Sequence, residues 1–260
     1  MNAPQSVVEL ARSRLGAASQ AWLAATLEHC STASTIEPLC QAVSMASRHA
    51  KPSAMLAPHA GERALLATAV SGFDPQRWTL LETVRVGLIA SWNGWSTPRA
   101  SLDLEELFRY VDVGEACASY RALAALPQPE RFAWRAGEGA RSNMRAIFEA
   151  TCCDTPYPVR FFDDLAWRQA VIKALFIGAP LARFVGLESR RDEVLARMAL
   201  DLADERTSAG REVPPDLWSC LGRHGGIRAA AAMEREIARG SPAGRQAAQR
   251  ALEHIAAASS

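Results

Sequence analysis

The sequence lacks a marked excess of either charge. It has 29 lysine and arginine residues and 28 aspartate and glutamate residues, which gives a net charge of +1. The two signs are mixed along the chain rather than gathered in blocks. Binding to nucleic acid or to an anionic membrane surface draws on a local concentration of basic residues. We therefore expect no nucleic-acid partner.

Long apolar runs are also missing. No stretch reaches the ~18 consecutive apolar residues that a transmembrane helix needs. The first residues mix acidic and basic side chains and lack the apolar core of a signal peptide. We therefore expect a cytoplasmic protein that does not insert into a membrane.

The six cysteines include no C-x-x-C pair, a spacing that argues against a zinc ribbon or a disulfide framework. His29 beside Cys30 could be half of a metal site, but no second pair stands at ligand spacing. The sequence therefore predicts free, mostly buried thiols, and neither a metal nor a cofactor. The cysteines are Cys30, Cys40, Cys117, Cys152, Cys153 and Cys220.

Strand signals are absent as well, since β-branched residues are sparse and no segment alternates apolar and polar side chains. Apolar residues instead recur at helical spacing, which predicts an all-α fold of helices joined by short loops. The predicted helices cover residues 6–28, 36–46, 62–70, 79–92, 102–111, 113–126, 140–151, 164–177, 191–209, 227–239 and 242–258, with short turns near 130–136 and 217–221.

The last two predicted helices indicate how the others are arranged. They are joined by a capped turn and are rich in small alanines, which is typical of one unit of a HEAT-type repeat. We therefore expect an irregular α-solenoid of HEAT-like antiparallel helix pairs, with a globular helical array as the alternative. Residues 1–260 should form a single domain, with a possible sub-boundary at the turn-rich segment 51–61.

The most distinctive stretch covers residues 151–186, where two prolines precede an acidic pair and an apolar segment. Pro156 and Pro158 disfavour helical backbone at the residues before them, so no helix should run through Tyr157. Asp163 can then cap the next helix. That helix is apolar in nearly every direction, which predicts that it is the central core helix.

The acidic pair in FFDDLAWR has two interpretations. It resembles the aspartate-rich motif of terpene and prenyl diphosphate synthases, in which paired carboxylates hold magnesium bridged to phosphates. Alternatively, Asp163 caps the helix and Asp164 forms an ion pair with Arg168 four residues later. A partial second metal motif consists of Asp204, Glu205, Ser208 and Glu212.

The structural interpretation of the acidic pair is the stronger one. Trp167 and Arg168 stand near the place where the enzyme motif has a further acidic residue, and Gly210 interrupts the second motif. We therefore assign no catalytic, cofactor-binding or metal-binding residue, and a non-enzymatic role is favoured.

The same stretch is a candidate interaction surface, because tyrosine, tryptophan and arginine are enriched at binding hot spots. Core packing under the proline-rich turn is the favoured explanation of its aromatic residues. Lys173 could be a low-pKa lysine that forms a Schiff base, but the favoured interpretation is that its ammonium group extends to the surface or meets a carboxylate. The candidate surface consists of Tyr157, Arg160, Phe161, Asp164, Trp167, Arg168 and Lys173.

Four segments, DVGEACASYRALAALP, EGARSNMRAIFEA, TPYPVRFFDDLAWRQAVIKALFIGAPL and LARMALDLADERTSAGREVPPDLW, resemble the EboA family. These bacterial proteins are found with a prenyltransferase and other biosynthetic enzymes in conserved gene clusters. The resemblance implies a helical scaffold or accessory protein in the biosynthesis or transport of a prenyl-derived metabolite, with partners in the same pathway. The alternatives are a metal-dependent enzyme on prenyl diphosphates and a carrier that shelters an apolar intermediate.

The cysteine spacing generates a direct test. All six thiols should react with a thiol reagent after the protein is unfolded without reductant, because no pair is spaced for a bridge or a zinc site. Recovery of fewer than six thiols would reveal a disulfide or a tightly held metal.

Overall fold

The computed structural model describes residues 2–258, with side chains through residue 255. The chain forms two compact units, of which the first ends at Phe162 and the second begins at Asp163. The segment at residues 51–61, which the sequence marked as a possible sub-boundary, lies inside the first unit.

Helices build both units, and the described residues contain no strand, only an isolated bridge between Met55 and Thr79. The predicted all-α class is therefore confirmed. Within residues 2–258, no helix combines the length and the apolar character that crossing a bilayer requires.

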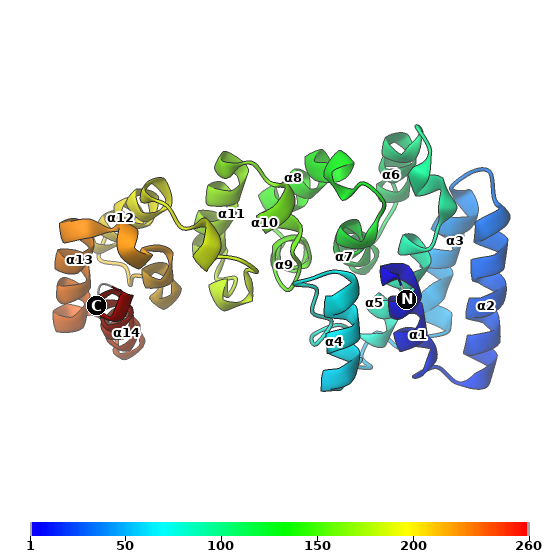
Figure 1. Cartoon of the computed structure of the whole chain (residues 1–260), viewed down its shortest axis with the longest axis horizontal. Helices are drawn as coiled ribbons and strands as arrows, with labels where there is room; N and C mark the ends of the chain where they lie inside the picture. The colour runs from blue at the N-terminus through cyan, green and yellow to red at the C-terminus, as the bar shows by residue number, and fades with distance from the viewer. Residues whose placement is uncertain (1, 259–260) are drawn as a thin grey trace. The chain divides into compact units, whose positions relative to one another are not determined.

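The α-helices of the first unit, drawn in blue to green in Figure 1, are α1 Ala3–Arg12, α2 Ala17–Thr32, α3 Glu37–Met45, α4 Ala60–Ala69, α5 Leu80–Ala90, α6 Ala100–Phe108, α7 Val113–Ala122, α8 Ala133–Arg141, α9 Arg145–Cys152 and α10 Tyr157–Phe161. Its 3-10 turns are η1 Ala46–Arg48, η2 Asn93–Ser96, η3 Leu123–Ala125 and η4 Pro129–Phe132.

The second unit has fewer and longer helices. Its α-helices are α11 Asp164–Ile177, α12 Glu193–Ser208, α13 Gly226–Arg239 and α14 Pro242–Ala258. Its 3-10 turns are η5 Leu181–Arg183, η6 Glu188–Arg190, η7 Pro215–Cys220 and η8 Gly222–His224.

Helix α5 forms the core of the first unit. All of its residues except Glu82 are buried. Thr79 and Glu82 cap its start reciprocally, because each side chain accepts the backbone N–H of the other residue. Helices α1 and α7 pack against α5, and Figure 1 shows α1 beside it. Gly87 permits the close approach of α1, since an added Cβ would lie only 3.1 Å from Val8 Cγ2.

Two buried arginines connect α5 with its neighbours. Arg85 is 4% exposed, and its guanidinium donates to the Val43 carbonyl at 3.0 Å and to a Glu115 carboxylate oxygen at 3.1 Å. Arg121 of α7 donates to Glu82 of α5 at 3.2 Å. Because a buried charge is tolerated only with partners, these contacts specify how α3, α5 and α7 pack.

Helix α11, predicted to be the central core helix, is covered on one side only. Trp167 and Val171 are buried, whereas Leu165 and Phe176 are 61% and 58% exposed. The prediction was wrong because apolar composition does not show which faces of a helix meet other helices. The most completely buried helix is α5.

Two local predictions also need correction. The expected helix over residues 6–28 is divided into α1 and α2, because Gly16 takes extended backbone before α2. A helix does begin at Tyr157, contrary to the proline argument. Pro156 adopts helical backbone, and Pro158 occupies the first turn of α10, where a missing N–H removes no helical hydrogen bond.

The buried pair on α5 gives a stability prediction. Replacing Arg85 with Met should lower the free energy of unfolding by about 3–5 kcal/mol, because Glu115 keeps a buried charge without its partner. Arg109→Met, which breaks the exposed pair with Glu106, should change it by less than about 1 kcal/mol.

Urea unfolding of both variants measures this difference. The double variant Arg85→Met/Glu115→Gln should recover part of the loss, because no buried charge is left unpaired. Equal unfolding midpoints for Arg85→Met and Arg109→Met would contradict the assignment.

Candidate functional site

The predicted acidic pair lies at the start of α11, where both carboxylates have partners. Asp163 caps the helix by accepting the N–H of Ala166 at 2.7 Å. Asp164 accepts a hydrogen bond from Arg190 at 2.6 Å and lies 3.5 Å from Arg168. The predicted cap and the predicted i,i+4 ion pair are therefore confirmed.

Arg168 has a stronger partner in Asp192, the N-cap of α12. Its Nε and Nη2 reach the Asp192 carboxylate at 2.9 Å and 2.5 Å, and that carboxylate also accepts the N–H of Leu195. Burial by itself would raise the pKa of Asp192, but the hydrogen bonds from Arg168 and Leu195 outweigh burial and lower it. This contact joins α11 to α12. It was not predicted, because Arg168 and Asp192 lie 24 positions apart and no local sequence pattern relates them.

Trp167 belongs to the core of the second unit. Its side chain is 1% exposed and meets the Phe184 ring edge-on at 6.1 Å between centroids. The Arg190 guanidinium lies over the indole at 5.0 Å, a cation–π contact. Arg190 thus links the buried Trp167 to the exposed Asp164.

The first unit holds the other aromatic part of the candidate surface. Tyr157 is buried, its hydroxyl donates to the Pro129 carbonyl, and its ring contacts that of Phe161. Burial raises the pKa of the Tyr157 hydroxyl. Arg160 is exposed at this position.

The structure therefore brings together three members of the predicted surface, Asp164, Trp167 and Arg168. Lys173 lies further along α11 and is half-buried. Because the rings of Tyr157 and Trp167 are buried, they stabilise the interior and offer little surface to a partner.

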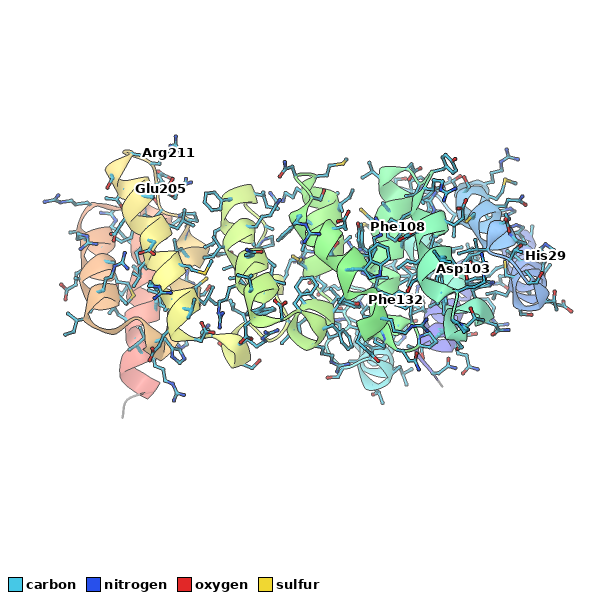
Figure 2. The ribbon with its side chains drawn as sticks, turned by 90° about the horizontal axis from the view of Figure 1, so that it is seen from above. His29, Asp103, Phe108, Phe132, Glu205 and Arg211 are labelled. Carbon is cyan, nitrogen blue, oxygen red and sulfur yellow. The ribbon has the colours of Figure 1, made fainter. Side chains whose placement is uncertain are left out.

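Asp204, in the second acidic motif, also has arginine partners. Asp204 accepts from Arg228 at 2.7 Å and from Arg235 at 3.1 Å, and Arg228 also reaches Asp201 at 2.7 Å. These pairs join α12 to α13. Glu205 lies on the last turn of α12, near Arg211 in Figure 2. Among the described residues, no three His, Cys, Asp or Glu side chains are grouped to hold a metal ion.

None of the six cysteines forms a disulfide, and five of them are buried, as predicted. Burial raises the pKa of Cys117 to about 11 and that of Cys220 to about 12. Cys30 is buried beside the exposed His29. Burial therefore favours the protonated thiols of Cys117 and Cys220 at neutral pH.

Sequence reasoning missed a cleft of about 1040 Å³ in the second unit. Its walls come from η5, η6, η7, η8 and α14. The apolar lining includes Phe184, Leu187, Trp218 and Ile255, and the polar lining includes Arg191, Arg223, Arg250, His224, His254, Glu188 and Asp216. No motif predicts this cleft, because short segments spread over residues 181–255 converge only in the folded unit.

The position of Trp167 gives a stability prediction. Trp167→Ala should lower the free energy of unfolding by about 3–5 kcal/mol, as large-to-small changes in cores do. Trp134→Ala, at a site 39% exposed, is the matched control and should have a clearly smaller effect. Chemical denaturation followed by circular dichroism measures both, and an unchanged midpoint for Trp167→Ala would place the ring outside the core.

The chain matches the family model described as "Metabolite traffic protein EboA" over residues 5–222. No curated protein and no solved structure matches it. The matched residues include α11 and α12 and end before α13. The match covers well over half of the sequence and confirms the resemblance carried by its four segments. The chain belongs to the EboA family of metabolite traffic proteins.

Proposed function

We propose that this chain is a non-catalytic scaffold or accessory protein, acting in the cytoplasm in the biosynthesis or transport of a prenyl-derived metabolite. The family match supports this most directly, because metabolite traffic is the description of the matching family. The partners would be other proteins of the same pathway.

The ion pairs that Asp164 and Asp204 form with arginines support a non-catalytic role. An enzyme acting on prenyl diphosphates would need Asp164 and Asp204 to hold magnesium. Asp164 is instead paired with Arg190 and Arg168, and Asp204 is paired with two arginines of α13. A metal ion would have to displace these cations from the same oxygens.

The scaffold role includes the HEAT-like arrangement expected from the sequence. Stacked helix pairs form extended surfaces that bind partner proteins. Helices α13 and α14, joined by Gly240 and Ser241, pack against each other as one such pair would.

A carrier that shelters an apolar intermediate is the second candidate. The cleft in the second unit favours it, because its volume of about 1040 Å³ lies at the upper end of the range for small-molecule sites, roughly 300–1,000 Å³. The two roles are compatible, since an accessory protein can hold a metabolite for its partners.

Variants of Asp163 and Asp164, at the start of α11, test whether the chain is an accessory protein or an enzyme. Purified protein incubated with magnesium and geranyl, farnesyl or geranylgeranyl diphosphate should release no pyrophosphate. Asp163→Ala should lower the free energy of unfolding by about 1 kcal/mol through loss of the N-cap. Asp164→Asn should lower it by less, because that carboxylate is exposed.

Pyrophosphate release that disappears in Asp164→Asn would overturn the non-catalytic role. Lack of turnover, together with co-purification of pathway proteins from the native host, would support it. Asp201→Asn is a matched control, because Asp201 is also an exposed carboxylate paired with arginine but lies outside both acidic motifs.

A further inference from the structure

We propose that the cleft of the second unit binds an amphipathic anion, a molecule with a phosphate or carboxylate head and an apolar body. This inference deepens the carrier role, and it rests on that role for the assumption that the natural ligand is a metabolite. The chemical class of the ligand follows from the residues that line the cleft.

The cleft carries more positive charge than its own carboxylates neutralise. Three arginines line it, against Glu188 and Asp216. Asp216 accepts the N–H of Leu181 at 2.9 Å, so one of its oxygens is already used. Within the described part of the chain, neither Arg223 nor Arg250 has an ion pair or a side-chain hydrogen bond. Both side chains are exposed and line the cleft, so both are available to an anionic group bound there.

Arg191 is positioned at the cleft by packing. Its Cδ lies against Gly222, where an added Cβ would be 3.0 Å away and the φ of +47° favours glycine. The Arg191 side chain is only 21% exposed, and its one ion pair among the described residues is a 3.6 Å contact with Glu188, which is 87% exposed. A buried guanidinium is costly without close partners.

A buried polar atom of Arg191 is also left unsatisfied. Its Nε has no hydrogen-bond partner within residues 2–258. Six buried side-chain nitrogens of the described residues lack a partner, and two of them, Arg191 Nε and Trp218 Nε1, belong to residues that line the cleft. The site holds a guanidinium that is largely desolvated, weakly neutralised and held in place, which is the arrangement expected for binding an anion.

The rest of the lining suits an apolar body. The largely buried Phe184, Leu187 and Trp218 form the apolar base of the lining, and the more exposed Ala251 and Ile255 of α14 add to it. Ligand sites commonly combine such an apolar lining with a few polar groups that orient the ligand. An inorganic anion would leave this surface unused.

Part of the cleft lies outside the residues that match the family. Arg223, His224 and the whole of α14 follow residue 222, where the match ends. The proposed ligand class therefore rests on the residues that line this cleft and not on the family match.

The test measures binding of four probes to the full chain by isothermal titration calorimetry. Octyl phosphate and octanoate carry the anionic head on an apolar chain, 1-octanol has the chain alone, and inorganic phosphate has the head alone. At least one amphipathic anion should bind about tenfold more tightly than 1-octanol or inorganic phosphate, as expected for charge-assisted hydrogen bonds combined with apolar burial.

Charge variants locate the site. Arg223→Gln/Arg250→Gln should weaken binding of the amphipathic anion by about tenfold or more. Arg239→Gln/Arg245→Gln is the matched control, because it removes the same charge from exposed positions of α13 and α14 outside the cleft. The control should bind like the unmodified protein.

A variant that fills the cleft tests whether the apolar body of the ligand binds there. Ala251→Trp places a large ring in the cleft and should abolish binding, whereas Ala243→Trp, on an exposed part of α14, should not. Circular dichroism and thermal melts of each variant show whether the fold is retained.

The inference would be overturned if neither octyl phosphate nor octanoate binds more tightly than 1-octanol, if neither binds more tightly than inorganic phosphate, or if both double arginine variants weaken binding equally. Absence of binding by all four probes would also overturn it. That result would leave the accessory role intact, because pyrophosphate release and co-purification test that role separately.

Discussion

A charged side chain can enter a protein interior only with partners, and this protein uses arginine at the junctions between its helices. In the first unit, Arg85 and Arg121 connect α5 with α3 and α7. In the second unit the pairs lie nearer the surface, where Arg168 connects α11 with α12 and the exposed Arg228 connects α12 with α13. The planar guanidinium suits these junctions, because it makes several hydrogen bonds in fixed directions.

The same constraint bears on function. Among the carboxylates of the two magnesium-like motifs, Asp163 caps α11, and Asp164 and Asp204 pair with arginines that connect elements of the second unit. The cleft presents the opposite case, since its arginines, Arg191, Arg223 and Arg250, outnumber its carboxylates, Glu188 and Asp216. Metabolite handling by an EboA family member is therefore more reasonably sought at the cleft than at the acidic pair of α11.

Prediction from the sequence succeeded where a few neighbouring residues determine the result. Asp163 caps α11 because an aspartate side chain can reach the free N–H groups of the turn that follows it. The Tyr157 prediction failed for an equally local reason, because proline also fits the first turn of a helix. The rings of Tyr157 and Trp167 had two interpretations that local pattern could not separate, and burial separates them.

The sequence by itself determined the all-α class, the Asp163 cap of α11, the lack of disulfides and the family, since these depend on residue type, local spacing and matching segments. Only the tertiary structure decided that α5 is the most buried helix, that Arg168 pairs with Asp192, and that five segments between residues 181 and 255 form a cleft. Those features join residues far apart along the chain. Periodicity shows which face of a helix is apolar, but packing decides what that face meets.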